Sequence, residues 1–320
     1  MTFRYAELES AITDSVRRMC EGKRVAVAFS GGLDSGLVAA IAREHAESVR
    51  LYTCGTSDSY DVRMARDLSE RLDLPWVHAE ISLDTMEARI REMIAATGTS
   101  DPFTISYEMP LFRVCQEADE EVILSGQGAD EYFMGCAKFV GKDDDEYRTL
   151  RDAGVERLLG VSVPCEISIA SHFGMDIRYP YLDPSVTSLV EAMDPEELRP
   201  DDMDSRKAVL KAIAIHLGHM VLADRKKKSS QYGSRTTDLI RSLARAQGLQ
   251  FNEYVESLYA DVFPARTVAE RCAVIHARVN RVLKEEAELV LYKSGISPSE
   301  AIDRFYRKVI EEGGLDFLGK

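Results

Sequence analysis

The chain has 320 residues, of which 45% are hydrophobic and 29% charged, a balance typical of globular proteins and unlike that of disordered or fibrous ones. Its net charge of −14 disfavours a general attraction to nucleic acid. The apolar runs, such as Val25–Phe29, are too short to cross a bilayer, and no signal peptide is visible. The six cysteines form no CxxC pair. We therefore expect a cytoplasmic protein of about two domains, with no membrane contact, disulfide framework or zinc site.

Predicted strands and helices alternate along the first half of the chain. A helix over 6–20 is followed by a buried strand at 24–29, a helical stretch at 37–46, a strand at 49–53, a helix over 62–72, and strands at 77–81 and 120–124. This alternation predicts right-handed βαβ units and an α/β fold, a parallel doubly wound sheet with helices on both faces. Residues 146–220 have mostly helical spacing, so a helical second half is expected.

The segment SGGLDS, from Ser30 to Ser35, lies between a predicted strand and a predicted helix. Gly31 and Gly32 allow a tight turn close to a ligand, and the following helix presents free N–H groups to an anion. Asp34 suits an anion site only if a cation such as Mg²⁺ lies between its carboxylate and the phosphates. The segment matches neither the Walker loop nor the dinucleotide fingerprint. A plain strand-to-helix turn is the alternative.

SGGLDS resembles the pyrophosphate loop of the N-type ATP pyrophosphatases, which activate a substrate by adenylation. Further segments are similar, in the same order, to those of asparagine synthetases. They are Ser59-x-Asp61-x-x-x-Ala65 with LDLPWVH (72–78), DPFTISYEMPLF (101–112), LSGQGADEYFMG (124–135), DIRYPYLD (176–183), RKAVLKAIA (206–214) and DRKKKSSQYGS (224–234). Over roughly residues 10–240 the chain therefore resembles the synthetase domain of the asparagine synthetase and β-lactam synthetase superfamily.

Two features depart from that family. The chain reaches the ATP loop within 30 residues of Met1, so we expect no N-terminal glutaminase domain; a separate glutaminase subunit is the alternative. Gln127 stands where the family usually has glutamate, so a neutral amide replaces a carboxylate near the expected acyl-adenylate. An amide there can still hydrogen-bond a carboxylate or an ammonium group.

The resemblance implies that ATP is the cofactor and that its site is formed by the strand ends and their loops. The implied residues are Ala28, Ser30, Gly31, Gly32, Asp34, Ser35, Cys54, Ser125, Gly126 and Gln127. Asp34 and Asp130 are the implied ligands of Mg²⁺, although an acid at the start of a helix is an alternative role for Asp130.

Four consecutive basic residues, 225–228, would stabilise the charge that develops as pyrophosphate leaves. Lys227 best matches the family's catalytic lysine, with Lys228 the alternative by a one-residue shift and Arg225 in the same candidate set; a solvated face is the structural alternative. Asp176 is a candidate for binding an amino group or orienting the nucleophile, and an ion pair with Arg178 is the other interpretation.

The implied reaction is attack of an aspartate-like carboxylate on the α-phosphorus of ATP and release of pyrophosphate. Ammonia or an amine then attacks the acyl-adenylate, giving an amide and AMP. Two alternatives stay open: a ligase for a different carboxylate, and a nucleotide-sensing DNA-binding regulator that reuses the fold.

Three parts are predicted along the chain: a synthetase-like domain over 1–247 with a leading helix at 1–22, a linker at 248–265, and a tail at 266–320. The tail carries a net charge of +1 and the rest of the chain −15. Residues 273–317 resemble a ribbon-helix-helix unit, which predicts a homodimer through paired strands at 273–280. The acidic body disfavours DNA binding through His276 and Arg278. A packed helical hairpin is the alternative.

Overall fold

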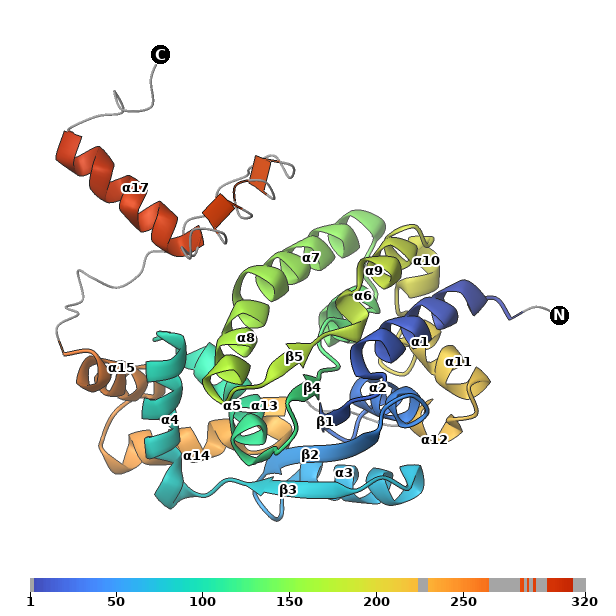
Figure 1. Ribbon diagram of the computed structural model, residues 1–320, viewed down its shortest axis with the longest axis horizontal. Helices are drawn as coiled ribbons and strands as arrows, with labels where there is room; N and C mark the ends of the chain where they lie inside the picture. The colour runs from blue at the N-terminus through green and yellow to red at the C-terminus, as the bar shows by residue number, and fades with distance from the viewer. Residues whose placement is uncertain are drawn as a thin grey trace. The chain divides into compact units, whose positions relative to one another are not determined.

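A computed structural model describes residues 3–223, 230–264, 283–284, 287, 290–291 and 298–312 (Figure 1). Five strands form one parallel sheet in the order β3-β2-β1-β4-β5. Their bounds are β1 Arg24–Ala28, β2 Ser48–Gly55, β3 Trp76–Glu80, β4 Val122–Leu124 and β5 Asp176–Arg178. The predicted α/β class with a parallel doubly wound sheet is therefore confirmed.

Helices cover both faces of the sheet, because its central strand is apolar on both sides. In β1, Val25 and Val27 pack into one core and Ala26 into another. The first core includes α1 (Ala6–Cys20), α2 (Leu33–Arg43), α3 (Tyr60–Leu72), α9 (Pro184–Glu191), α11 (Ala208–His216) and α12 (Met220–Ala223). The second includes α4 (Leu83–Thr97), α5 (Pro102–Glu117), α8 (Val163–His172), α14 (Thr236–Ala246) and α15 (Phe251–Val262).

The remaining described elements of this part of the chain are short, apart from α7. They are α6 Ala129–Tyr132, a 3₁₀ turn Ala137–Phe139, α7 Asp144–Arg157, a π-helical turn Leu158–Ser162, a 3₁₀ turn Pro180–Leu182, α10 Pro195–Leu198 and α13 Ser230–Gly233. The second half is thus mostly helical, as the spacing predicts.

The strand order places one crevice at the centre of the sheet. From β1 the chain moves outward to β2 and β3, then returns to the other side of β1 to form β4. Between β1 and β4, the connections that follow the two strands leave in opposite directions. Open α/β sheets bind ligands at such a switch point, beyond the carboxyl ends of the strands. The loops after β1 and β4 are the SGGLDS and SGQGAD segments.

One later element was not predicted, and one expectation is wrong. Residues 176–178 form the short strand β5, which pairs with β4, inside the stretch that is otherwise mostly helical. The expected linker at 248–265 instead contains α15, whose Tyr254, Val255 and Leu258 are buried against α4 and α14. These residues therefore belong to the body of the protein and do not form a linker.

The chain divides into two compact units, Met1–Ala265 and Arg266–Lys320. The second unit contains α17, Pro298–Glu312, which lies within the stretch 273–317 that resembles a ribbon-helix-helix unit. The strand expected at 273–280, and with it the predicted dimer contact and DNA-binding residues, lies outside the described residues.

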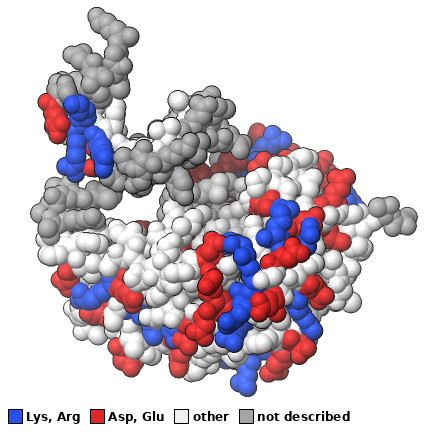
Figure 2. Space-filling view, viewed as in Figure 1, with Lys and Arg blue, Asp and Glu red and all other residues white. Residues whose placement is uncertain are grey.

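Acidic and basic side chains are interspersed over the face of the first unit shown in Figure 2. Many of the charges form local ion pairs, such as Lys142 with Glu146 and Arg151 with Asp152. Among the described helices, none combines the length and the apolar composition that a bilayer crossing requires.

Candidate active site

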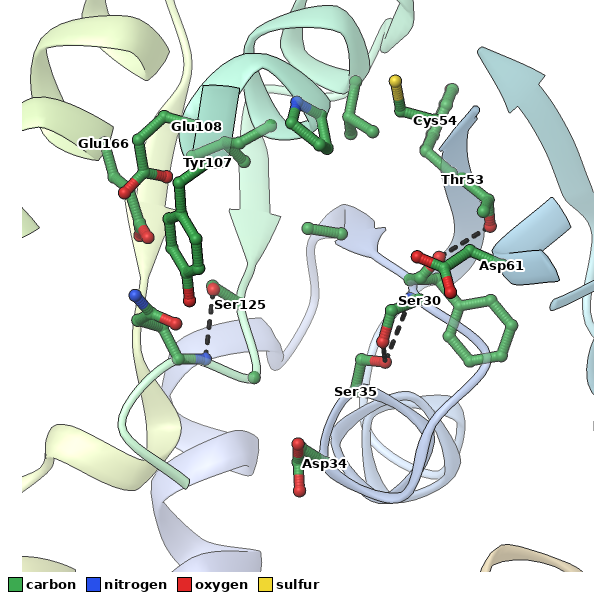
Figure 3. A pocket seen from close by; sticks show the side chains of 18 of the residues that line it. Ser30, Asp34, Ser35, Thr53, Cys54, Asp61, Tyr107, Glu108, Ser125 and Glu166 are labelled. Atoms are coloured by element: carbon green, nitrogen blue, oxygen red, sulfur yellow. Dashed lines mark hydrogen bonds between the residues drawn. The ribbon is translucent and has the colours of Figure 1, made fainter. Parts of the chain in front are cut away.

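The SGGLDS loop wraps tightly around the N-terminus of α2. Gly31 has φ +71°, and a Cβ there would lie 2.5 Å from the backbone nitrogen of Ala65 in α3, so only glycine fits. The Ser30 backbone N–H donates to Ser35 Oγ at 3.2 Å, and the two hydroxyl oxygens are 3.4 Å apart (Figure 3). The loop therefore directs two hydroxyl groups and the amino end of α2 at one point, an arrangement suited to phosphate oxygens.

The loop after β4 lies directly against the first loop. A Cβ on Gly126 would lie 2.9 Å from the backbone nitrogen of Ser35, so the contact requires glycine. The Gln127 backbone N–H donates to Ser125 Oγ at 3.2 Å, which holds the turn (Figure 3). Gly128 completes the turn at φ +92° and leads into α6. The two predicted motif loops thus meet at the switch point.

One buried cation joins the two predicted magnesium ligands. The Lys207 ammonium lies 2.6 Å from Asp34 Oδ1 and 2.5 Å from Asp130 Oδ1. Asp34 is buried, and Asp130 lies at the start of α6 with its side chain 32% exposed. The two carboxylates therefore converge on one point that already holds a positive charge.

The backbone conformation at Lys207 places its side chain between the two carboxylates. Lys207 was not among the site residues predicted from the sequence. It is 8% exposed and has φ +57°, a conformation rare for residues other than glycine, immediately before α11. A Cβ on Gly135 would lie 2.1 Å from its Cε, so Gly135 leaves room for the lysine side chain. The available signal was its position in the RKAVLKAIA segment, which carries the family resemblance.

A pocket of about 800 Å³, its open mouth included, lies beyond the strand ends. Nine predicted site residues line it: Ala28, Ser30, Asp34, Ser35, Cys54, Ser125, Gly126, Gln127 and Asp130. Gly31 and Gly32 shape the loop without lining the pocket. Burial raises the pKa of the Cys54 thiol to about 12, so this wall is uncharged.

The pocket also contains residues that were not among the predicted site residues, although Asp61 and several residues of α5 lie in the motif segments. Phe29, Tyr52 and Thr53 come from the ends of β1 and β2, Asp61 from α3, and Tyr107, Glu108, Pro110, Leu111 and Val114 from α5; Glu166 comes from α8. Figure 3 shows Glu108 and Glu166 together beside Tyr107, on the far side of the pocket from Thr53.

Asp176 does not lie in this pocket. It is the first residue of β5 and pairs in register with Val122, the first residue of β4, so it lies at the opposite end of the sheet. Its Oδ2 accepts hydrogen bonds from Arg178 Nε and Nη2 at 2.8 and 2.6 Å. The structure therefore favours the ion-pair interpretation of Asp176 over a role at the substrate.

The basic run 225–228, with the candidates Arg225, Lys227 and Lys228, lies outside the described residues. The residues on both sides of it approach the site. Leu222 packs on Gly36 of α2, and Gly233 of α13 lies against the carboxylate of Asp61.

Comparison with known proteins supports the family that the motifs indicate. Residues 7–163 match the family model of asparagine synthase. The chain is similar to asparagine synthetases. "Putative asparagine synthetase (glutamine-hydrolyzing) 1" of Methanocaldococcus jannaschii is 26% identical over 295 residues, covering 78% of this chain and 54% of that protein. The glutamine-hydrolyzing asparagine synthetase of Brassica oleracea is 27% identical over 225 residues, covering 64% and 38%.

The chain spans about half or less of the length of these curated relatives. Among solved structures, NMN synthetase from Francisella tularensis covers 87% of this chain and all of its own, with a TM-score of 0.40 and 13% identity. The likeness to asparagine synthetases is a similarity of sequence over part of their length, while the fold rests on the sheet topology described above.

Proposed function

We propose that this chain is an ATP-dependent ligase that adenylates a small carboxylate and transfers the acyl group to ammonia or an amine, releasing pyrophosphate and AMP. One observation supports the proposal most directly: the SGGLDS and SGQGAD loops meet around one pocket, where Asp34 and Asp130 both contact the Lys207 ammonium. An aspartate-like molecule is the substrate that the family resemblance suggests.

The residues present fit Mg²⁺, since two hard carboxylate oxygens converge on one cation position beside a phosphate-type loop. Asp34 and Asp130 would hold the ion, which when bound supplies positive charge to the phosphates. Ser30, Ser35 and the amino end of α2 would bind the phosphate oxygens. Ala28 and Cys54 would border the adenine on one side, and Ser125 and Gly126 on the other.

A lysine of the basic run would stabilise the charge on the departing pyrophosphate. We assign this role to Lys227, with Lys228 as the alternative, because the residues flanking the run lie against α2 and the pocket residue Asp61. Ammonia is the simplest nitrogen donor. A separate glutaminase would supply it if this chain resembles its glutamine-hydrolyzing relatives in that respect.

The test is ATP–pyrophosphate exchange across a panel of amino acids and dicarboxylates, with and without Mg²⁺. We expect exchange that needs the metal, and an Asp34→Asn variant slower by at least about 100-fold, because a metal bridge to the phosphates contributes several kcal/mol. Asp84→Asn, an exposed aspartate on α4, is the matched control and should exchange normally. Near-normal exchange in Asp34→Asn would refute the assignment.

A further inference from the structure

Two buried glutamates face the proposed active-site pocket from neighbouring helices. Glu108 of α5 is 3% exposed and Glu166 of α8 is 4% exposed, and both line the pocket. The two carboxyl groups lie close to each other in Figure 3 and interact electrostatically. Neither residue belongs to the ATP loops.

Local irregularities in both helices accompany this placement. Pro110, two residues after Glu108, lies inside α5, where proline cannot donate the usual helical hydrogen bond. The π-helical turn 158–162 immediately precedes α8, which carries Glu166. Single π-helical turns are frequent at functional sites. The helices therefore depart from regular geometry close to both carboxylates.

These carboxylates are incompletely satisfied within the protein. Glu108 Oε1 and Glu166 Oε2 are buried, and neither has a hydrogen-bond partner in the part of the chain that the structure describes. Burial, followed by the charge of Glu166, raises the pKa of Glu108 well above its ordinary value, against the opposing charge of Arg157. Burial raises the pKa of Glu166 to about 8; the charge of Glu131 adds to this and Tyr179 opposes it. Buried charges normally require a partner.

We propose that Glu108 and Glu166 together bind the primary ammonium group of a substrate. A primary ammonium group has a positive charge and three N–H donors. It can therefore donate a hydrogen bond to both Glu108 Oε1 and Glu166 Oε2 and balance their negative charge. A guanidinium favours both oxygens of a single carboxylate, whereas here two carboxylates each offer one oxygen. Magnesium or calcium needs about six oxygen ligands, and no metal-type group of three His, Cys, Asp or Glu occurs among the described residues.

Part of this inference rests on the proposed function, because that function decides where the ammonium comes from. It belongs either to the amino group of the carboxylate substrate or to the ammonia or amine that attacks the acyl-adenylate. Both have the same chemistry at the site. Separate measurements are needed to distinguish them.

The site itself can be tested without catalysis. The thermal unfolding midpoint of the full chain is measured near neutral pH in methylammonium chloride and in tetramethylammonium chloride at equal ionic strength. The second ion has the charge but no N–H donor. We expect methylammonium to raise the wild-type midpoint by about 2 °C more than tetramethylammonium does. The Glu108→Gln/Glu166→Gln variant should lose this difference between the two ions. Glu166→Gln alone should lose it as well, and this single variant, which retains Glu108, serves as the test if the double variant folds poorly.

Glu120→Gln is the matched control. Glu120 is also a buried glutamate, but it accepts a hydrogen bond from the Tyr52 hydroxyl at 2.8 Å and lies outside the pocket lining. This variant should keep the methylammonium preference. No preference in the wild-type protein, or an equal preference in the Glu108→Gln/Glu166→Gln variant, overturns the proposal.

The source of the ammonium is tested by ATP–pyrophosphate exchange with aspartate and with succinate, which lacks the amino group. If the pair binds the substrate's amino group, Glu166→Gln slows exchange with aspartate at least tenfold and leaves exchange with succinate unchanged. If it binds the nucleophile, exchange is unchanged and the KM for ammonium in amide formation rises at least tenfold. Exchange and KM that are both unaffected overturn the proposal. Wild-type protein that exchanges with no carboxylate refutes the proposed function instead, and the methylammonium measurement still decides the ammonium site.

Discussion

Two carboxylate pairs line the same pocket, and they differ in what neutralises them. Asp34 and Asp130 share the ammonium of Lys207, which lies within 2.6 Å of both. Among the described residues, no cation is shared by Glu108 and Glu166, and each has an oxygen without a hydrogen-bond partner. The first pair is neutralised by Lys207, whereas no described residue supplies a shared charge to the second.

The contrast matters because a buried carboxylate costs several kcal/mol unless it is paired. A chain selected for stability alone would place glutamine or an apolar residue at positions 108 and 166. The protein has glutamates at both positions, and burial raises the pKa of each. Carboxylates with raised pKa values beside an ATP-type loop are typical of a functional site. Asp34 and Asp130, paired with Lys207, therefore stabilise the ligand-free protein, whereas Glu108 and Glu166 destabilise it.

Removing the lysine from the first pair should have the largest effect. In Lys207→Met, the buried Asp34 loses its ion pair with the Lys207 ammonium, so we expect the free energy of unfolding to fall by about 3–5 kcal/mol, measured by urea denaturation. Added Mg²⁺ should restore more stability to this variant than to the wild-type protein, because the ion replaces the lost charge.

Lys138→Met is the control for that measurement. Lys138 is exposed and its ammonium lies over the ring of Phe139, so the change should cost less than about 0.5 kcal/mol. A Lys207→Met variant as stable as the control would mean that the first pair does not depend on its lysine, and the comparison would fail.

Removing a carboxylate from the second pair, Glu108 and Glu166, should raise the free energy of unfolding, by less than the loss of Lys207 lowers it. The pKa of Glu166 is higher in the folded protein, about 8, than its ordinary value, so the folded state binds more protons over that interval. Its unfavourable effect is absent below the ordinary glutamate pKa, grows as pH rises and is complete above about 8. Glu166→Gln should therefore raise the free energy of unfolding near pH 8 by about 1–3 kcal/mol and have little effect near pH 4.

Calorimetric or denaturant unfolding at several pH values measures this dependence. The titratable groups that interact with the Glu166 carboxylate are those of Glu108, Glu131, Tyr179, Cys115 and Cys165, and all are unchanged in the variant. Arg157 acts on the neighbouring Glu108 and is also unchanged. Glu120→Gln should keep the wild-type slope of stability against pH. An equal slope in Glu166→Gln would show that Glu166 is ordinary and that the two pairs do not differ as argued.

The first pair could be found from the sequence, and the second could not. Asp34 and Asp130 lie in short motifs after strands, and parallel strands bring the residues that follow them to one edge. Glu108 lies in the DPFTISYEMPLF segment, but nothing local pairs it with Glu166, because the two come together only when α5 packs on α8. Lys207 is intermediate: its segment was noted for its resemblance, but its ion pairs depend on tertiary structure.

The presence or absence of a local sequence pattern also explains which strands and helices were predicted. The strands β1 to β4 are marked by apolar runs between helices, whereas β5 has three residues and a single buried side chain, Ile177, which is too little for a pattern. For α15 a signal did exist: Gln250 and Glu253 form a capping box, a recognisable helix start. The preceding Gly248 and the mixed composition favoured a linker instead.

Substitution of Asp176 should have the smallest effect on stability and activity. It tests whether an acidic residue outside the two pocket pairs matters for catalysis. Its carboxylate is 60% exposed and paired with Arg178 at the end of the sheet away from the pocket, unlike either pocket pair. Exposed ion pairs contribute about 0–1 kcal/mol, so Asp176→Asn should change the free energy of unfolding by less than about 1 kcal/mol. ATP–pyrophosphate exchange should stay within about twofold of wild type, since no pocket residue loses a contact. Loss of exchange with unchanged stability would mean that Asp176 reaches the substrate in a conformation other than this one, and a third carboxylate would then have to be added to the two pairs.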